Sequence, residues 1–258
     1  LAHCCSAVLE TLAGGNILEF GAGSGKLALD VLTALEAMDS LPAQYLILER
    51  SGDLRQRQQQ TLQAHAPHLL QRVSWLDTLP EAEFRGVILA NEVLDAMAVE
   101  RFYWDGAAAD LWHVASGDSG FNWQRRAAQD QSTRAAVRKL AADCGLAPGY
   151  VSEINTALEP WVQTIAGRLE SGLLLLIDYG YPRHEYYHPQ RSAGTLMCHY
   201  RQRAHDDPLL WPGLQDITAH VDFTAVAEAA VSAGLDVTGY PAQSYFLLDN
   251  GLENLLQA

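Results

Sequence analysis

A turn with three alternating glycines lies near the start of the chain, and an acidic residue stands two positions before it. The turn is part of the stretch ILEFGAGSGKLALDVL, residues 17–32, in which Glu19 is followed by Gly21, Gly23 and Gly25. Glycine has no side chain and adopts positive φ angles, so the backbone of such a turn can approach a ligand closely. A glycine-rich turn between an apolar run and an amphipathic run is typical of a site for a nucleotide-like ligand.

Two phosphate-binding motifs fit this turn poorly. A P-loop has the pattern G-x-x-x-x-G-K-[ST], but Phe20 stands at its first glycine and Leu27 at its hydroxyl position. Without that hydroxyl a magnesium ligand is missing, which excludes a nucleoside triphosphate. A dinucleotide-binding turn has the pattern G-x-G-x-x-G, and Lys26 stands at its third glycine, where a strand and a helix must pack closely. The dinucleotide interpretation is weakened but stays open.

A third pattern, E-x-G-x-G-x-G, fits every position of the turn. It is typical of the first motif of class I S-adenosylmethionine-dependent methyltransferases. Their cofactor carries no phosphate, and its methionine half has a positively charged ammonium and sulfonium. Glu19 can interact with this cationic half, while the glycines admit the ribose and methionyl groups. The pattern therefore predicts S-adenosylmethionine as the cofactor.

Polar side chains also follow the next three apolar runs. Glu49 follows the second run, where an acid can accept hydrogen bonds from both ribose hydroxyls. Leu76 and Asp77 follow the third run, where the acid can accept a hydrogen bond from the adenine amine. Asn91 follows the fourth run and is expected to contact the cofactor. One acid after a strand is more often a helix cap or a solvated charge, but the whole set favours a cofactor site.

These side chains come together only if the apolar runs are parallel strands of one sheet. The runs are short and do not alternate with polar residues, as expected for strands covered on both faces. Helical patterns at 27–38 and 51–64 separate the first three runs, and Ser51 is a candidate N-cap. We therefore predict an α/β, doubly wound, mostly parallel sheet with its ligand beyond the carboxyl ends of the strands. The predicted strands cover residues 16–20, 44–49, 72–75, 86–90 and 173–178.

The alternation of strands and helices is interrupted between residues 98 and 150. Residues 98–115 predict a hairpin that turns at Asp105-Gly106, and residues 116–150 are mixed in character. We expect 98–150 to be a β-containing or irregular insertion that contributes to the substrate cleft. The cofactor-binding core would then comprise residues 1–97 and 151–258. Further predicted elements are a helix over 154–169, a helix over 223–231 capped by Asp222, and a strand over 244–249.

The composition limits the partners and the compartment. The 258 residues include 31 acidic and 17 basic side chains, and the formal charge of −14 disfavours nucleic acid and favours a cationic partner. The four cysteines form no C-x-x-C pair, which indicates reduced thiols. No apolar run is long enough for a membrane span, and no signal peptide is visible. We expect the cytoplasm of a bacterium, or the mitochondrial matrix if the source is eukaryotic. The first residue is Leu1 rather than Met, which indicates missing upstream residues.

From NEVLDA (91–96) onward the sequence resembles the MidA-like methyltransferases. This family includes a mitochondrial complex I assembly factor that acts as a protein arginine methyltransferase. The resemblance implies S-adenosylmethionine as the cofactor and a protein arginine as the methyl acceptor. Family members also have an upstream segment that helps to cover the cofactor and a longer C-terminal tail, and both are expected to be missing here. The resemblance continues through SEIN (152–155), LLIDYGYPRHEYYHPQRSAGTL (175–196), HDDPLLWPGLQDITAHVDF (205–223) and SYFLLDNG (244–251).

Methyl transfer to arginine requires carboxylates beside the acceptor. A guanidinium is a poor nucleophile because its lone pairs are delocalised and its pKa exceeds ~12. Carboxylates can clamp it, orient one nitrogen and localise charge on another. Asn91, Glu92 and Asp95 stand at the catalytic position of class I enzymes, and Glu92 and Asp95 are the first candidates for this clamp. They lie three residues apart on a turn or new helix and can share a face. A charge at a helix terminus is the alternative for Asp95.

The remaining candidates leave other functions open. Glu153, Asp178 and His220 are weaker candidates for the substrate cleft. The histidines and aspartates between 199 and 222 match no compact metal motif, so no metal is expected. A non-catalytic assembly or binding protein that retains the fold stays possible, as does a methyltransferase for a small molecule or RNA, although the charge weighs against RNA. A homo-oligomer is also compatible with the sequence.

Overall fold

The computed structural model describes residues 1–81, 83–118 and 120–253. It divides the chain into two compact units. The first unit comprises Leu1–Val93, Thr164–Ile177 and residues 236–253. The second comprises Leu94–Gln163 and Asp178–Leu235, so it takes in residues 178–235 in addition to the 98–150 segment.

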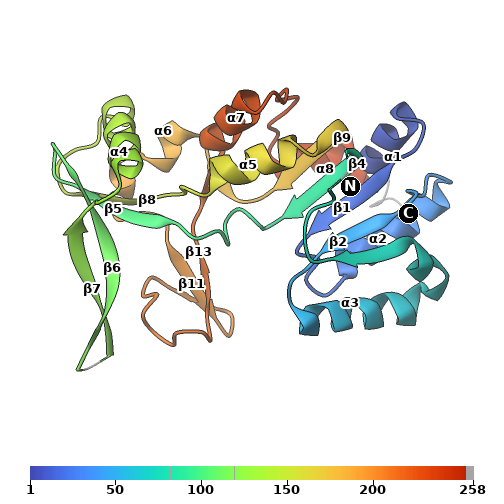
Figure 1. Ribbon diagram of the computed structural model, residues 1–258, viewed down its shortest axis with the longest axis horizontal. Helices are drawn as coiled ribbons and strands as arrows, with labels where there is room; N and C mark the ends of the chain where they lie inside the picture. The colour runs from blue at the N-terminus through green and yellow to red at the C-terminus, as the bar shows by residue number, and fades with distance from the viewer. Residues whose placement is uncertain (82, 119, 254–258) are drawn as a thin grey trace. The chain divides into compact units, whose positions relative to one another are not determined.

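The first unit is built on a five-stranded parallel sheet (Figure 1). Its strands stand in the order β3-β2-β1-β4-β9, so the chain switches direction across the sheet between β1 and β4. In such sheets ligands bind beyond the carboxyl ends of the strands at this switch point. All five predicted strands are confirmed. The strands are β1 (Asn16–Phe20), β2 (Tyr45–Leu48), β3 (Val73–Leu76), β4 (Phe84–Asn91) and β9 (Leu169–Ile177).

Apart from α8, in which none of the described residues is buried, the helices of the first unit form because their apolar side chains complete one core with the sheet. Leu32 and Leu35 of α2 and Leu62 of α3 are fully buried with Tyr45 and Ile47 of β2. Ser51 caps α3 by accepting a hydrogen bond from the Leu54 amide, as predicted. The helices are α1 (Ala2–Thr11), α2 (Lys26–Ala37), α3 (Gly52–His65), the 3-10 helix η1 (Pro67–Arg72) and α8 (Gln243–Asp249).

The second unit contains a four-stranded antiparallel sheet in the order β7-β6-β5-β8. The predicted hairpin is confirmed, since β5 (Glu100–Trp104) pairs with β6 (Ala109–Gly117) around Asp105-Gly106. Asp105 Oδ1 accepts hydrogen bonds from the Ala107 and Ala108 amides and fixes this turn. The other two strands of this sheet are β7 (Gly120–Ala127) and β8 (Tyr150–Ile154).

Helix α4 (Gln131–Cys144) packs against this sheet with Val137, Leu140 and Ala141 buried. Asp130 caps it by accepting a hydrogen bond from the Thr133 amide at 2.7 Å. The remaining elements of the unit are short. They are β10 (Gly180–Tyr181), α6 (Arg183–Tyr186), η2 (Pro189–Arg191), β11 (Met197–Tyr200), β12 (Arg203–His205), β13 (Asp216–Thr218), β14 (Val221–Asp222) and α7 (Phe223–Ser232).

Two predicted elements need correction. The helix expected over 154–169 is shorter, because Ile154 ends β8, where it pairs with Glu100 of β5, and α5 covers only Leu158–Ala166. The strand expected over 244–249 is wrong, because these residues belong to α8. A short apolar run fits a strand or a buried helix equally well by periodicity alone. Among the described residues no helix has the length and apolar character that crossing a membrane requires.

Candidate functional site

The glycine turn forms an open cradle after β1. Gly21, Gly23 and Gly25 all have positive φ angles, at 60°, 52° and 80°. A Cβ atom at Gly21 or Gly23 would meet nothing within 4 Å, so open space lies beside both residues. At Gly25, the N-cap residue directly before α2, a Cβ atom would lie 2.9 Å from Gln58 Cα. The turn therefore needs glycine at Gly25 for packing and at the other two positions for backbone conformation.

Gln58 of α3 joins this turn to the neighbouring strand ends. Its side chain is fully buried, and its Nε2 donates to Gly23 O at 3.1 Å and to Glu49 Oε2 at 3.2 Å. Its Oε1 accepts a hydrogen bond from Trp75 Nε1 at 2.8 Å. Sequence reasoning missed Gln58, because these partners lie far away in the chain and no local pattern marks them.

The loops after β2 and β3 are joined by Arg55. Its Nε donates to Glu49 O at 2.6 Å, and its NH2 group donates to Leu76 O at 2.6 Å and Asp77 Oδ1 at 2.7 Å. Glu49 is buried, and its Oε1 accepts a hydrogen bond from the Ser51 amide at 2.9 Å. The side chain of Asp77 is 85% exposed. The structure thus brings Glu49, Leu76 and Asp77 together with the glycine turn, as the order of the strands requires.

Glu19 is buried in β1, where the Tyr45 hydroxyl donates to its Oε2 at 2.6 Å. Burial raises the pKa of Glu19 to about 7, although the hydrogen bond from Tyr45 opposes this shift. A carboxyl group with this pKa changes its charge near neutral pH, and a nearby cation would favour its ionised form. Its predicted interaction with the cationic half of the cofactor stays a prediction.

Asn91 and Glu92 stand at the end of β4, and both are exposed. Glu92 has a φ angle of 51°, which is uncommon for a residue with a side chain. Its amide donates to Ile177 O at 2.8 Å, which ties the end of β4 to the end of β9. Strain of this kind is more frequent at functional sites.

These strand ends fit S-adenosylmethionine. The open space at Gly21 and Gly23 can admit a ligand, and Glu49 presents a buried carboxylate of the type that accepts hydrogen bonds from a ribose diol. Acidic groups also suit the positive charge of the methionyl half.

In the second unit, Asp178 fixes the turn that carries Asp95. Asp178 Oδ2 accepts hydrogen bonds from the Leu94 amide at 3.0 Å and the Asp95 amide at 3.2 Å, and Oδ1 accepts one from the Tyr179 amide at 2.9 Å. Burial and the nearby Asp95 raise the pKa of Asp178 to about 6. Asp178 is thus occupied by backbone amides of this turn.

Asp95 is buried, and one of its carboxylate oxygens is unused. The Tyr179 hydroxyl donates to Oδ2, whereas Oδ1 has no hydrogen-bond partner among the described residues. Burial and this hydrogen bond raise the pKa of Tyr179 to about 12, so the hydroxyl stays a donor at neutral pH. The alternative of a charge at a helix terminus is wrong, because residues 92–99 form a turn with no helix. Asp95 is buried while Glu92 is exposed, and the two residues belong to different units.

Glu153 and His220 are linked through Thr195 in the second unit. Glu153 is fully buried in β8, and its Oε2 accepts hydrogen bonds from the Thr195 amide at 2.7 Å and hydroxyl at 3.3 Å. The same hydroxyl accepts a hydrogen bond from the His220 amide at 3.1 Å. The His220 ring stacks on Tyr181 at a centroid distance of 5.2 Å and meets Tyr179 edge-on at 5.5 Å. Burial lowers the pKa of His220, which favours the neutral ring. Sequence reasoning missed Thr195.

Within the described ranges, no group of three or more His, Cys, Asp or Glu side chains is arranged to hold a metal ion. His199 and His205 lie on paired strands β11 and β12.

The parallel sheet, the glycine turn after β1 and the acidic strand ends define a Rossmann-like class I methyltransferase fold. Residues 1–241 match the family described as "Putative S-adenosyl-L-methionine-dependent methyltransferase", and the chain belongs to this family. The resemblance to the MidA-like methyltransferases and the prediction of S-adenosylmethionine as the cofactor are both confirmed.

Relatives and solved structures support the same family. A crystal structure from Burkholderia thailandensis, bound to S-adenosyl-homocysteine, is 45% identical and superposes with a TM-score of 0.93, covering 99% of this chain and 65% of that one. The protein arginine methyltransferase NDUFAF7 homologue of Caenorhabditis elegans is 25% identical over 94% of this chain and 59% of its own length. Its Drosophila melanogaster counterpart is 29% identical over 85% and 53%. The chain thus spans a little over half the length of these curated relatives.

Proposed function

We propose that the protein transfers a methyl group from S-adenosylmethionine to an arginine side chain of another protein. The observation that carries this proposal is the buried Asp95 carboxylate, whose Oδ1 has no partner among the described residues. A buried acceptor without a hydrogen bond is costly, so a donor brought by the substrate would stabilise it. The names of the two curated relatives, both protein arginine methyltransferases, support the same acceptor.

A guanidinium fits this carboxylate better than other acceptors do. It presents five N–H donors in a planar fork, it carries the opposite charge, and its bond to a carboxylate is charge-assisted. The Tyr179 hydroxyl holds Oδ2, and the Asp95 backbone is held by Asp178 and by the Ala219 amide, which donates to Asp95 O at 3.0 Å. Oδ1 is therefore held in place before the substrate binds, which limits the entropy lost on binding.

The chain's residues would bind and orient the acceptor, while the cofactor supplies an electrophilic methyl group when bound. Asp95 would accept an N–H of the guanidinium and offset its charge. Glu92 is our proposal for the second carboxylate, on the ground of its position in NEVLDA and its unusual backbone conformation. Asn91 is proposed to contact the cofactor. A proton must leave the guanidinium as the new N–C bond forms, and we propose that it passes to solvent.

Asp95→Asn tests the proposal because it keeps the size of the side chain and removes its charge. We expect transfer to protein arginine to fall about 100-fold, the magnitude found when one preorganised polar contact to the reacting group is lost. Cofactor affinity, measured by calorimetry, should change less than about threefold. Glu92→Ala is expected to behave in the same way. If either variant lost transfer and cofactor binding equally, that residue would be a cofactor ligand instead.

The same measurements distinguish arginine methylation from the alternative functions. A protein that binds the cofactor but transfers no methyl group would be an assembly or binding protein, and a label found on small molecules would indicate a different acceptor. The curated relatives are named as mitochondrial, so we propose the mitochondrial matrix if the source is eukaryotic. A basic protein substrate is the partner that the net charge of −14 favours.

A further inference from the structure

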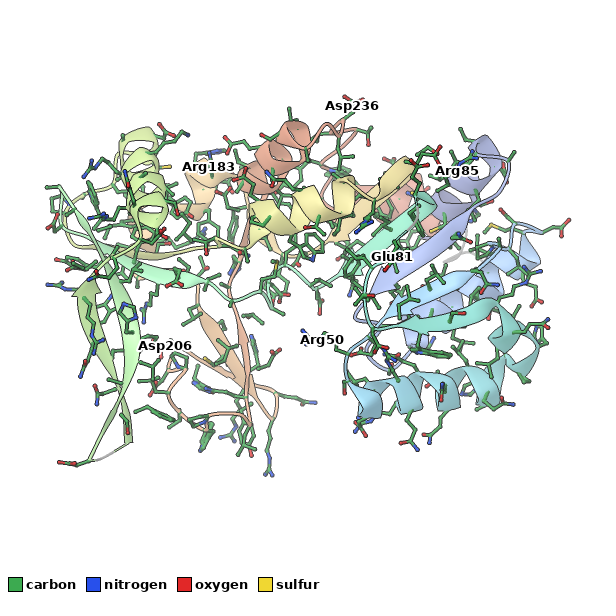
Figure 2. All side chains as sticks on the ribbon, in the orientation of Figure 1. Arg50, Glu81, Arg85, Arg183, Asp206 and Asp236 are labelled. Atoms are coloured by element: carbon green, nitrogen blue, oxygen red, sulfur yellow. The ribbon has the colours of Figure 1, made fainter. Side chains whose placement is uncertain are left out.

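The second unit contains a cavity of about 650 Å³. It is lined by α4, by the end of β8 and the residues after it, by α6 and by α7. Figure 2 labels Arg183, which comes from α6 and is one of the lining residues. Asp95 is not among the described residues that line the cavity, although its neighbour Leu94 is. The cavity is therefore distinct from the contact at Asp95 Oδ1.

The charges that line the cavity are mostly negative. Both lining cations are already paired with carboxylates. Arg183 Nε lies 3.0 Å from Asp222 Oδ2 and its NH2 group lies 2.6 Å from Glu228 Oε2, while Lys139 Nζ lies 2.9 Å from Asp143 Oδ2. Two further acids, Glu153 and Glu159, remain after these pairs are formed. The acidic lining residues are Asp143, Glu153, Glu159, Asp222 and Glu228.

Two lining residues also have buried acceptor atoms that are unused. Glu153 is fully buried, and its Oε1 has no hydrogen-bond partner among the described residues. Arg101 Nε lies 3.9 Å away, which is beyond hydrogen-bond distance and offsets only part of the charge. His220 Nδ1 is likewise buried without a partner in the described part of the chain. A neutral histidine protonated at Nε2 presents Nδ1 as an acceptor.

The cavity has two unused acceptors and a surplus of negative charge. A ligand that fits it would donate hydrogen bonds and carry a positive charge. Tyr186, Leu140 and Leu158 also line the cavity and offer apolar surface for an aliphatic stem. An arginine or lysine side chain combines these two properties, because its charged head lies at the end of an apolar chain.

We propose that this cavity binds a second basic side chain of the acceptor protein, next to the arginine that is methylated. The inference rests on the proposed function for its choice of ligand. It implies that the preferred acceptors carry two cationic residues, of which Asp95 contacts one and the cavity holds the other. The buried Glu153 carboxylate would supply a charge-assisted hydrogen bond, and His220 Nδ1 would accept a second.

The binding site can be tested with N-acetyl-arginine amide as the probe and its neutral analogue N-acetyl-citrulline amide as the control ligand. The Asp95→Asn variant serves as the background, so that the contact at Asp95 does not contribute. We expect one equivalent of the arginine probe to bind, with a Kd on the order of 1 mM. The citrulline probe should bind at least tenfold more weakly. Titration followed by NMR measures both.

Two substitutions in this background locate the probe. Glu153→Gln keeps an oxygen for Thr195 and removes the charge, and His220→Phe keeps a ring against Tyr181 and removes Nδ1. Each should weaken binding of the arginine probe at least tenfold. Glu170 is an exposed acid of β9, and Glu170→Gln should leave the affinity for the probe unchanged. Unchanged far-UV circular dichroism and Tm confirm that each variant is folded, and His220→Phe decides the outcome if Glu153→Gln unfolds.

The outcomes for the cavity and for the proposed function are separable. No binding in the Asp95→Asn background, equal binding of the neutral probe, or unchanged affinity in both cavity variants would overturn the cavity proposal. Methyl transfer to protein arginine is measured independently on the wild-type chain. If the probe binds at the cavity but no arginine is methylated, the cavity binds cations and the proposed function is wrong.

Discussion

Two neighbouring aspartates of the second unit illustrate how burial and hydrogen bonding separate the tasks of identical side chains. Both oxygens of Asp178 accept hydrogen bonds from backbone amides, so its carboxyl group shapes the turn. Asp95 has one oxygen held by Tyr179 and one left without a partner among the described residues. The sequence suggested both residues as candidates, but only the geometry distinguishes the one that holds the turn from the one that keeps an unused acceptor oxygen.

The raised pKa of Glu19 predicts that the stability of the protein depends on pH. Burial raises its pKa from 4.5 to about 7, so the native state retains a proton that the unfolded chain loses between these pH values. The native state then binds more protons than the unfolded state, and the free energy of unfolding falls as the pH rises through this window. Glu19→Gln removes this titration and keeps an oxygen for the Tyr45 hydroxyl.

We therefore expect the stability of Glu19→Gln relative to wild type to increase by about 3 kcal/mol between pH 4.5 and pH 8. Urea unfolding at several pH values measures this difference, with Glu170→Gln as an exposed control. A stability difference that stays constant over this range would show that Glu19 has an ordinary pKa in the folded protein.

At the scale of elements, α3 is the part of the first unit that holds the candidate cofactor site together. Its Gln58 reaches the glycine turn and Glu49, and its Arg55 reaches the loops after β2 and β3. The sequence shows α3 as a polar helix with a serine cap and gives no indication of these contacts. The helix is nevertheless what aligns the predicted cofactor residues with one another.

Gln58→Ala should lower both the cofactor affinity and the stability of the protein. It leaves Trp75 Nε1 without its acceptor and removes a donor from both Gly23 O and Glu49 Oε2. We expect the Kd for S-adenosylmethionine to rise about tenfold and the free energy of unfolding to fall by about 2 kcal/mol, because buried polar groups lose their partners. Gln59→Ala changes an exposed residue of the same helix and serves as the matched control in calorimetry and urea unfolding. Equal effects of the two variants would refute the positioning role of Gln58.

The strands of the parallel sheet could be predicted because each is a short apolar run with polar residues at its carboxyl end. The cofactor motif could be predicted for the same reason, since its residues follow those strands directly. Helix α4 escaped prediction, although Asp130 and the buried Val137, Leu140 and Ala141 provide a cap and an apolar stripe. The residues that connect the site, Gln58, Arg55 and Thr195, could not be predicted, because their hydrogen bonds join segments far apart in the sequence.

At the scale of the molecule, we propose that the two compact units carry different parts of the chemistry. The first contains the glycine turn and the acidic strand ends that fit S-adenosylmethionine. The second contains Asp95, His220 and the acidic cavity, which suit a basic acceptor. The net charge of −14 is consistent with a basic acceptor, because an acidic protein attracts a positively charged substrate at long range.

The central claim is that this protein methylates arginine in another protein. The most direct test supplies S-adenosylmethionine with a deuterated methyl group to the purified protein, together with proteins extracted from cells that lack its gene. Mass spectrometry of the digested proteins then locates the label. We expect labelled methylarginine with the wild-type protein and about 100-fold less with Asp95→Asn. Label on lysine, on RNA or on a small molecule would contradict the claim, as would the absence of transfer by a protein that binds the cofactor.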